Sequence, residues 1–395
     1  MAKAVSRTLP RGVIALGLVS MFMDVSSEMI HSLLPLFLVG VLGLNALAVG
    51  LIEGIAESTA AITKIFAGVA SDWIGKRKPL VLLGYGLAAL TKPLFPLATG
   101  AGTVLAARFL DRIGKGIRGA PRDALVADLT PKSMHGAAYG VRQSMDTAGA
   151  FAGPALAMAF MALSGNNFRF VFWIAVLPAV ISVACVVFGV QEPETHAVGG
   201  NRRFPLQRRE IRRLSLKFWL VVMFASMLTL ARFSEAFLLL RAANVGLAVT
   251  YVPAVLIVMN LIYSASAYPF GHLSDRLNRG SLLAVGIGFL IAADLVLAAA
   301  NATWAVLAGS TLWGLHMGAT QGLLTTIVAA TAPADLRATA FGLFSLVTGA
   351  ALLLASGLAG FLWATYGPAV TFLAGAVFST VALAGLLARR PRSAP

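Results

Sequence analysis

Three titratable residues fall on one face of an apolar stretch near the start of the chain. Asp24, Glu28 and His31 are four and then three residues apart, which places them in one stripe along an α-helix. Two carboxyl groups one turn apart in surroundings of low dielectric cannot both stay ionised without a cost. The stripe therefore predicts a proton-binding group with a hydrogen-bonded histidine. A site for a divalent metal ion, built from the same three residues, is the alternative.

A second concentration of charge lies in residues 108–123, RFLDRIGKGIRGAPRD, where seven of sixteen residues are charged. At about 100° per residue these side chains fall within an arc of about 140°, so a helix here has one polar face. They are Arg108, Asp111, Arg112, Lys115, Arg118, Arg122 and Asp123. The basic face predicts contact with an anionic or zwitterionic ligand, and ion pairing with acids of neighbouring helices is the alternative. For Arg118, Arg122 and Asp123, near one end of the helix, a structural or gating role is favoured.

The composition indicates which solvent surrounds these charges. The chain is 58% hydrophobic and 12% charged, and its mean hydropathy is +0.84. Soluble domains usually carry about 25% charged residues. Twelve apolar runs are long enough to cross a bilayer. They span 12–39, 46–70, 79–99, 102–124, 137–163, 168–190, 217–241, 249–271, 281–300, 303–331, 338–363 and 367–388. The sequence therefore predicts an all-α membrane protein with 12 transmembrane helices.

The net charge of +15 reflects the placement of basic residues between these runs. Lys and Arg residues precede the first run and occur at 76–78, in the segment 191–216 and in the last residues after the final run. The turns at 40–45, 100–101 and 364–366 contain neither. Basic loops stay on the cytoplasmic side of a membrane. Both termini are therefore predicted to be cytoplasmic, and the charge needs no nucleic-acid partner.

The sequence also repeats itself. Residues 128–140 (DLTPKSMHGAAYG) align with 330–342 (ATAPADLRATAFG), and 68–78 (GVASDWIGKRK) align with 271–280 (GHLSDRLNRG), both at an offset of about 202 residues. A parallel repeat of six helices is a transporter architecture, with the substrate path at the interface between repeats. The expected division is a six-helix bundle in 1–190, a basic cytoplasmic linker in 191–216, and a second bundle in 217–395.

Four short patterns in the sequence resemble motifs of the major facilitator superfamily (MFS). The first is the loop motif at Gly68, Asp72, Gly75, Lys76 and Arg77, and its weaker second copy is at Gly271, Asp275 and Arg276, with Asn278 in place of the second glycine. Arg108, Gly114 and Gly116 resemble a third motif, although Arg112 stands where glycine is usual. GAFAGP at 149–154 resembles the G-x-x-x-G-P pattern that is typical of the family's antiporters. The resemblance covers nearly the whole chain.

This resemblance implies roles for particular residues. It implies that the loop motif gates the cytoplasmic side, with Asp123 and Asp128 as partners of Lys76 and Arg77; a passive topology anchor is the alternative. Gly149, Gly153 and Pro154 would allow close packing of their helix. The helices predicted over 12–39, 102–124, 217–241 and 303–331 would surround a central cavity. The substrate-cavity candidates are Arg108, Asp111, Arg112, Lys115, Arg232, Glu235, His316 and Gln321, whereas Asp294 is interpreted as structural.

The repeat supplies a control for the basic face. The positions that correspond to Arg108, Arg112 and Lys115 are Ser310, Gly314 and Met317, so the second bundle is expected to fold without that stripe. This favours a substrate or coupling role for part of the face. If Asp24 and Glu28 do not carry the proton, Glu53, Glu57, Asp111 and Glu235 are the next candidates.

Together these features predict a secondary active transporter. The expected activity is proton-coupled efflux of a small anionic or zwitterionic organic solute by alternating access, in a monomer in the cytoplasmic (inner) membrane of a bacterium. Proton-coupled uptake of an organic acid, and export of a metal ion or metal chelate, are the alternatives. A membrane-embedded enzyme or a receptor is disfavoured, because no nucleophile is clustered with a base and no sizeable output domain is present. The sequence has no phosphate-binding loop, so ATP-driven transport is not expected. No cofactor is expected.

Overall fold

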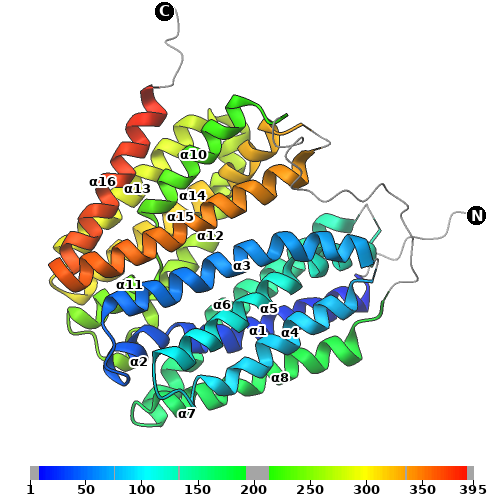
Figure 1. Cartoon of the computed structure of the whole chain (residues 1–395), viewed down its shortest axis with the longest axis horizontal. Coiled ribbons are helices and arrows are strands. Elements are labelled where there is room, and N and C mark those ends of the chain that lie inside the picture. The colour runs from blue at the N-terminus through cyan, green and yellow to red at the C-terminus, as the bar shows by residue number, and fades with distance from the viewer. Residues whose placement is uncertain (1–8, 75, 132–133, 193–212, 334–335, 389–395) are drawn as a thin grey trace, which may run out of the picture. The chain divides into compact units, whose positions relative to one another are not determined.

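The described part of the chain is helical. The computed structural model describes residues 9–74, 76–131, 134–192, 213–333 and 336–388, and it contains no strand within them. The side chains of Asp72, Asp275 and Arg276 are not among those described. The helices are shown in Figure 1. In chain order they are α1 (Arg11–His31), α2 (Leu34–Gly40), α3 (Ala46–Ile74), α4 (Lys78–Thr91), η1 (Lys92–Leu94), α5 (Ala101–Asp128), α6 (His135–Leu163), α7 (Phe168–Ile174), α8 (Val176–Ala184), η3 (Cys185–Gly189), α10 (Leu216–Ala231), α11 (Ala236–Asn244), η4 (Val249–Tyr251), α12 (Ala254–Arg276), α13 (Arg279–Ala299), α14 (Thr303–Thr331), α15 (Arg337–Tyr366) and α16 (Pro368–Ala388).

All twelve predicted apolar runs are helical, and several of them are divided. The first run becomes α1 and α2, and the seventh becomes α10 and α11. Pro35 lies in the first turn of α2, where its missing N–H costs no hydrogen bond. Asp24, Glu28 and His31 therefore lie on the helix that ends just before this break. The predicted all-α fold class is confirmed, whereas the cytoplasmic side of the two termini stays a prediction.

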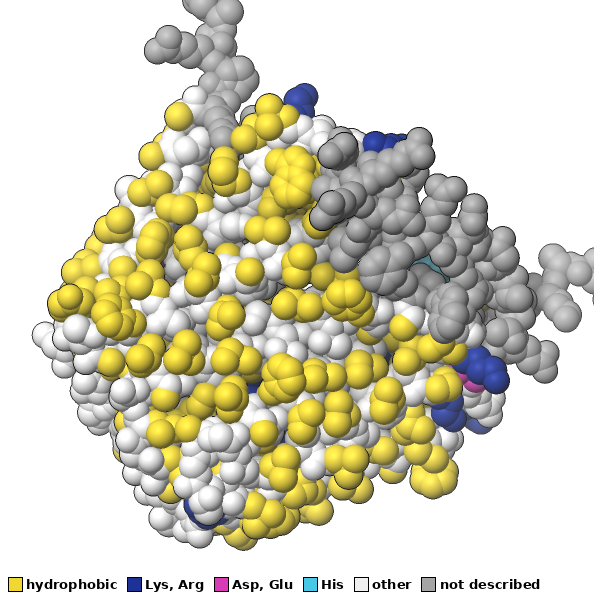
Figure 2. Space-filling model, viewed as in Figure 1, with side chains coloured by type: hydrophobic (Ala, Val, Ile, Leu, Met, Phe, Trp, Pro, Cys, Tyr) yellow, Lys and Arg dark blue, Asp and Glu magenta, His cyan; other side chains and the backbone are white. Residues whose placement is uncertain are grey.

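The surface of the helices suits a hydrocarbon environment. Nine helical segments in the described residues are long and apolar enough to cross a membrane. Large apolar side chains such as Leu90, Leu163 and Phe188 are exposed. Figure 2 shows hydrophobic side chains spread over the visible face, with charged side chains few and local. The protein is a multi-pass integral membrane protein.

Packing divides the chain into two compact units. The first contains the described residues of Met1–His31 and Thr59–Arg203, and the second contains those of Ser32–Ser58 and Phe204–Pro395. The second unit includes the first half of α3, which packs closely against α15 at Gly360. A β-carbon added at Gly360 would lie 2.6 Å from the carbonyl oxygen of Ala46. Most of the basic linker lies outside the described residues, so the predicted boundaries stay a prediction.

The two units use the same pairs of helices. In the first unit α1 packs against α6 and α8, while α4 packs against α5 and α8. In the second, α10 packs against α15 and α16, while α13 packs against α14 and α16. Counted along the chain, these are equivalent pairs in the two halves. The sequence repeat is therefore also a repeat in three dimensions.

Two buried or part-buried arginines fix equivalent turns of the two units. Arg169, at the start of α7, donates hydrogen bonds to the carbonyls of Pro96 and Ala98 in the turn between η1 and α5. Arg241, on α11, donates to the carbonyls of Leu297, Ala298 and Ala300 in the turn between α13 and α14, and to Asn244. Pro96 and Ala98 correspond to Ala298 and Ala300 at the repeat offset of about 202 residues. Carbonyls at helix ends need such donors because the helix itself supplies none.

We expect Arg241→Met to destabilise the second unit. The substitution keeps the apolar stem but leaves buried carbonyls without donors, which costs about 1–3 kcal/mol. The thermal unfolding midpoint of the purified protein in detergent should therefore fall. Lys217→Met, at an exposed position of α10, is the control and should leave the midpoint unchanged. Equal midpoints for Arg241→Met and the wild type would contradict a capping role.

Candidate functional site

The acids of α1 lie against the glycines of α6. A β-carbon added at Gly149 would lie 2.9 Å from the β-carbon of Asp24, and one added at Gly153 would lie 2.5 Å from that of Glu28. The glycines are four residues apart, as the acids are, so the two helices meet in register along one turn. Any larger residue at either glycine would displace α1 or its acid. The backbone of α6 therefore positions Asp24 and Glu28 directly.

The two acids have different charged neighbours. Glu28 Oε2 lies 3.5 Å from Nδ1 of the mostly buried His31, and Lys115 and Arg112 are within electrostatic reach. Asp24 instead has the carboxyl group of Asp146, on α6, as a like-charged neighbour. Its opposite charges are Lys115, Arg118 and Arg122 of α5. Glu28 thus has a partner on its own helix, whereas the charges around Asp24 come from α5 and α6.

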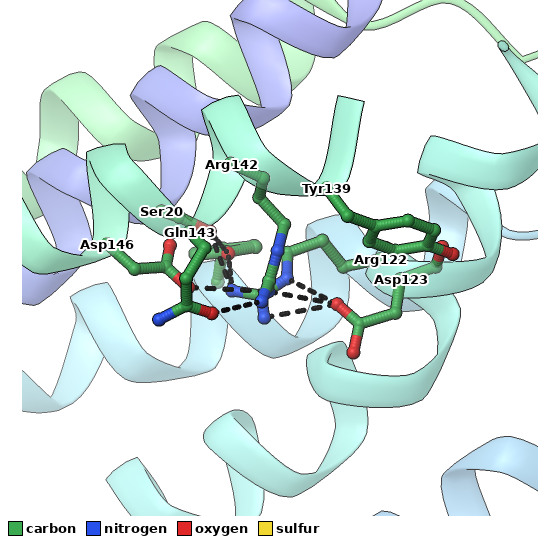
Figure 3. Close-up of polar contacts among 8 residues, drawn as sticks. Ser20, Arg122, Asp123, Tyr139, Arg142, Gln143 and Asp146 are labelled. Carbon is green, nitrogen blue, oxygen red and sulfur yellow. Dashed lines mark hydrogen bonds and ion pairs between the residues drawn. The ribbon is translucent and has the colours of Figure 1, made fainter. Parts of the chain in front are cut away.

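A network of polar side chains joins α1, α5 and α6 (Figure 3). Arg122 donates to Ser20 Oγ at 2.6 Å and contacts Asp123 at 3.2 Å. Arg142 lies between two carboxylates, with Asp123 Oδ1 at 3.0 Å and Asp146 Oδ2 at 3.3 Å from its Nη1. The network therefore links the helix that carries Asp24 to both neighbouring helices.

Sequence reasoning did not single out Arg142 and Asp146. Both lie in the apolar run predicted over 137–163, and charge within such a run is costly unless it is paired. That cost is the signal by which they could have been found. Only the structure, however, shows that Arg142 also pairs with Asp123 of α5.

A buried ion pair holds η1, which follows α4 directly, to α5. Lys92 Nζ lies 2.9 Å from Asp111 Oδ1, and each side chain is only 2% exposed. Lys92 Nζ also lies 3.0 Å from Ser27 Oγ of α1. Sequence reasoning missed Lys92. A lysine inside the apolar run 79–99 is costly unless it is paired, and this cost could have identified it, as it could have identified Arg142. Asp111, a substrate-cavity candidate, is here held inside the unit.

The polar face of α5 points inward and its apolar face outward. Arg108, Arg112 and Arg118 are buried, whereas Phe109 and Leu110 are exposed. Arg118 stacks on the ring of Tyr85, with its guanidinium carbon 4.7 Å from the ring centre, and Tyr85 is itself fully buried. Such an arrangement keeps most of the charge away from lipid, as the predicted arc required. Lys115 is the exposed cation of the face.

Glycines allow α5 to approach its neighbours closely. A β-carbon at Gly114 would lie 2.6 Å from the Gly84 carbonyl oxygen of α4, and one at Gly116 would lie 2.5 Å from the Thr63 β-carbon of α3. Gly68 of the loop motif does not provide such an approach, because a β-carbon there would make ordinary contact with Ala120 at 3.5 Å. The tight contact between α3 and α5 therefore depends on Gly116.

In the second unit, several polar side chains of the described residues lie near a helix break. Arg232 and Glu235 flank the residues between α10 and α11, and Arg232 has Glu235 and Tyr263 as electrostatic neighbours. Tyr263 donates to Gln321 Oε1 at 3.0 Å. Sequence reasoning missed Tyr263. Tyr263 lies on α12, a different helix from Arg232 and Gln321, so no periodic pattern in the sequence relates it to them. Only the tertiary contact identifies it.

His316 is fully buried on α14. Its Nδ1 lies 2.7 Å from the carbonyl oxygen of Gly286, so Nδ1 is the protonated nitrogen, because a carbonyl only accepts. Its Nε2 has no hydrogen-bond partner among the described residues. His316 thus ties α14 to α13 with one nitrogen and leaves the other as an acceptor.

Comparison with known proteins identifies the family. The family model described as Major Facilitator Superfamily matches residues 16–240 and 233–395. The chain belongs to the Major Facilitator Superfamily. It is 32% identical over 387 residues to an uncharacterised MFS-type transporter of Methanocaldococcus jannaschii, with 96% of this chain and 95% of that protein covered. It is 24% identical to the inner membrane transport protein YajR of Escherichia coli, over 86% of this chain and 74% of that protein.

Solved structures show the same MFS fold. A crystal structure of the nucleoside transporter NupG has a TM-score of 0.79 at 13% identity, covering 95% of this chain and 99% of that one. A POT family transporter in complex with 5-aminolevulinic acid also has a TM-score of 0.79, at 12% identity and 96% coverage of each chain. The family match and the MFS-type relative show that the protein is a membrane transporter of the MFS type and not an enzyme.

Part of the loop motif of this MFS transporter lies within the described residues. Arg77 pairs with Asp128, one of the two expected carboxylates, at 2.6 Å. The backbone N–H groups of Arg77 and Lys78 donate to the carboxylate of Glu192, at 2.7 and 2.6 Å. Glu192 therefore occupies the N-terminus of α4, a position that favours negative charge.

The structure describes only some of the gate candidates. Gly75 and the side chains of Asp72, Asp275 and Arg276 lie outside the described residues, so the expected bonds of Asp72 stay a prediction. Gly271 and Lys76 are exposed. Sequence reasoning missed Glu192, because its partner α4 lies more than a hundred residues earlier in the chain.

We expect the Lys92–Asp111 pair to behave as a coupled unit in stability measurements. Lys92→Met or Asp111→Leu alone strands a buried charge, which costs about 3–5 kcal/mol. The double variant Lys92→Met/Asp111→Leu strands none and should recover most of that loss. Unfolding of all three variants in detergent measures the coupling. Additive losses in the double variant would show that the two side chains do not stabilise each other.

Proposed function

We propose that this MFS transporter is a proton-coupled antiporter that exports a small zwitterionic organic solute by alternating access. The observation that carries the proposal is the contact of Gly149 and Gly153 with Asp24 and Glu28. The antiporter-like pattern of α6 and the acids of α1 form one helix interface. Any shift of α1 against α6 would change the surroundings of both carboxyl groups, as coupling to a proton gradient requires.

Asp24 is the proposed proton carrier. Its like-charged neighbour Asp146 disfavours the charged pair, and uptake of a proton by Asp24 removes that repulsion. Glu28 is instead close to His31, Lys115 and Arg112, which favour its ionised form. The proposal therefore assigns the proton to Asp24 and a positioning role to Glu28 and His31.

The charges around Asp24 favour a zwitterionic substrate. The acidic group of such a solute would bind Arg112 and Lys115, and its cationic group would compete with the proton for Asp24. Competition between proton and substrate for one group produces antiport, because each drives the release of the other. A purely anionic solute would instead bind better when Asp24 is neutral, which is the condition for symport. The chemistry of the substrate and the direction of transport are thus linked.

The remaining assignments follow from the same proposal. In the second unit Arg232, Glu235, His316 and Gln321, together with Tyr263, are proposed to contact the solute. The loop motif, from Gly68 to Arg77, and its copy at Gly271, Asp275 and Arg276 are proposed to gate the cytoplasmic side, with Asp123, Asp128 and Glu192. The protein would act as a monomer in a bacterial cytoplasmic membrane with both termini inside.

A growth screen tests the substrate class and the direction. Bacteria with and without the protein are grown on a panel of zwitterionic compounds, organic acids, cationic drugs and metal salts. We expect the protein to raise tolerance to one or more zwitterionic compounds, because export lowers their concentration inside the cell. Sensitisation to organic acids would show uptake instead, and tolerance confined to metal salts would favour the metal alternative.

We expect Asp24→Asn to abolish gradient-driven transport while keeping exchange. The amide is neutral and similar in size, so it does not add a buried charge, but it cannot carry a proton. Flux of the compound found in the screen is measured in proteoliposomes, once with a pH gradient and once as counterflow without one. Glu28→Gln is the matched variant and should keep gradient-driven flux.

Two other results would redirect the assignment. Loss of gradient-driven flux in Glu28→Gln alone would transfer the role to Glu28. Normal flux in both variants would contradict a proton carrier on α1, and Glu53, Glu57, Asp111 and Glu235 would be tested next.

A further inference from the structure

Another acidic residue, separate from the acids of α1, lies fully buried in the second unit. Asp294 of α13 has no exposed surface. Neither of its carboxyl oxygens has a hydrogen-bond partner among the described residues. The acids of the first unit contrast with it, since Asp111, Asp123 and Asp146 each have a cation within ion-pair distance.

The carboxyl group of Asp294 occupies space that a glycine leaves open. A β-carbon added at Gly375 of α16 would lie 2.7 Å from Asp294 Oδ2 and 3.1 Å from the ring of Phe233. Phe233 in turn packs against Phe237, Trp313 and Phe372, with ring centres 5.5, 5.6 and 5.5 Å away. The carboxyl group therefore lies at the edge of an aromatic cluster.

The charged and titratable groups of the surrounding helices are engaged elsewhere. Arg241 of α11 binds the carbonyls at the end of α13, and His316 of α14 binds Gly286. Arg232 and Glu235, beside Phe233, are electrostatic neighbours of each other. Tyr263 of α12 donates to Gln321. The helix α16 has no titratable side chain.

These surroundings select a proton as the ligand of Asp294. An ionised carboxylate without partners in an apolar interior costs several kcal/mol, and in practice such a group becomes neutral. A metal ion would require several oxygen ligands, which an aromatic cluster does not supply. A proton needs only the carboxylate itself.

We propose that Asp294 is a proton-binding site of the second unit, separate from the α1 acids, and that it holds its proton in this conformation. The carboxylate and the proton combine to the neutral acid, and no other group changes. Release requires water or a cation at the carboxylate. Phe233 lies in the break between α10 and α11, where the N–H of Ser234 donates to Ser356 rather than within a helix. A change at this break would move Phe233 and open Asp294.

This site goes beyond the proposed export activity and does not depend on its direction. It gives each unit its own protonatable acid, so the number of protons moved in a cycle need not be set by α1 alone. It also assigns a role to the break between α10 and α11, which divides a helix that the sequence predicts to be continuous. Asp294→Asn would mimic the protonated form.

Infrared spectroscopy of the full-length protein in lipid bilayers tests the proposal. At neutral pH we expect a carbonyl stretching band of a protonated carboxyl group that shifts in D₂O and is lost in Asp294→Asn. Asp24→Asn is the control and should leave this band in place, whatever its effect on transport. Absence of the band in the wild type, or its persistence in Asp294→Asn, would overturn the proposal.

A second variant keeps the test decisive if Asp294→Asn does not fold. Gly375→Ala places a methyl group against Asp294 Oδ2 and leaves the acid in the chain. We expect the same band to shift in frequency, because the surroundings of the carbonyl change. An unchanged band in a folded Gly375→Ala protein would show that the protonated group is not Asp294.

Discussion

Charge inside an apolar helical unit must find a partner within that unit, and this requirement determines how the first unit packs. In hydrocarbon no water solvates a stranded ion, so each cation of α5 has to meet an acid, an aromatic face or a polar neighbour. Asp111 meets Lys92, Arg118 meets Tyr85, and Arg122 meets Ser20 and Asp123. Because these partners come from α1, α4, η1 and α5 itself, the electrostatic requirement fixes which helices stand next to α5.

The pairing of buried charges also requires that the helices approach each other closely. Short side chains such as Asp24 reach their neighbours only when the helix backbones nearly touch, and Gly149 and Gly153 provide that distance on α6. The contact therefore serves packing and chemistry together. A motion that separates α1 from α6 alters the electrostatic balance at Asp24, and a change of protonation at Asp24 alters the preferred packing. Reciprocity of this kind is what links a proton to a conformational change.

The two units satisfy the constraint in different ways although they use equivalent helix pairs. In the second unit, Ser310 and Met317 occupy the positions of Arg108 and Lys115, and both are buried without charge. The fold itself therefore does not need the basic stripe. Arg241 and His316 bind backbone carbonyls instead of acids, and Asp294 has no partner among the described residues. Among the described residues, the first unit thus holds several of its charges in ion pairs, whereas Arg241 and His316 of the second unit bind carbonyl oxygens.

The sequence by itself determined the properties that are periodic or compositional. Apolar runs of bilayer length predicted the helices, the offset of about 202 residues predicted the repeat, and the spacing of Asp24, Glu28 and His31 predicted one shared stripe. Tertiary structure alone decided the partners. Lys92, Arg142 and Glu192 bind residues that are distant in the chain, and Asp146 is a neighbour of Asp24 on another helix. No local period records which helix packs against which. The breaks at Ser32–Leu33 and at Arg232–Glu235 were missed for a related reason. An apolar run reports only how much surface can face lipid, whereas a break depends on hydrogen bonds and close contacts that neighbouring helices provide.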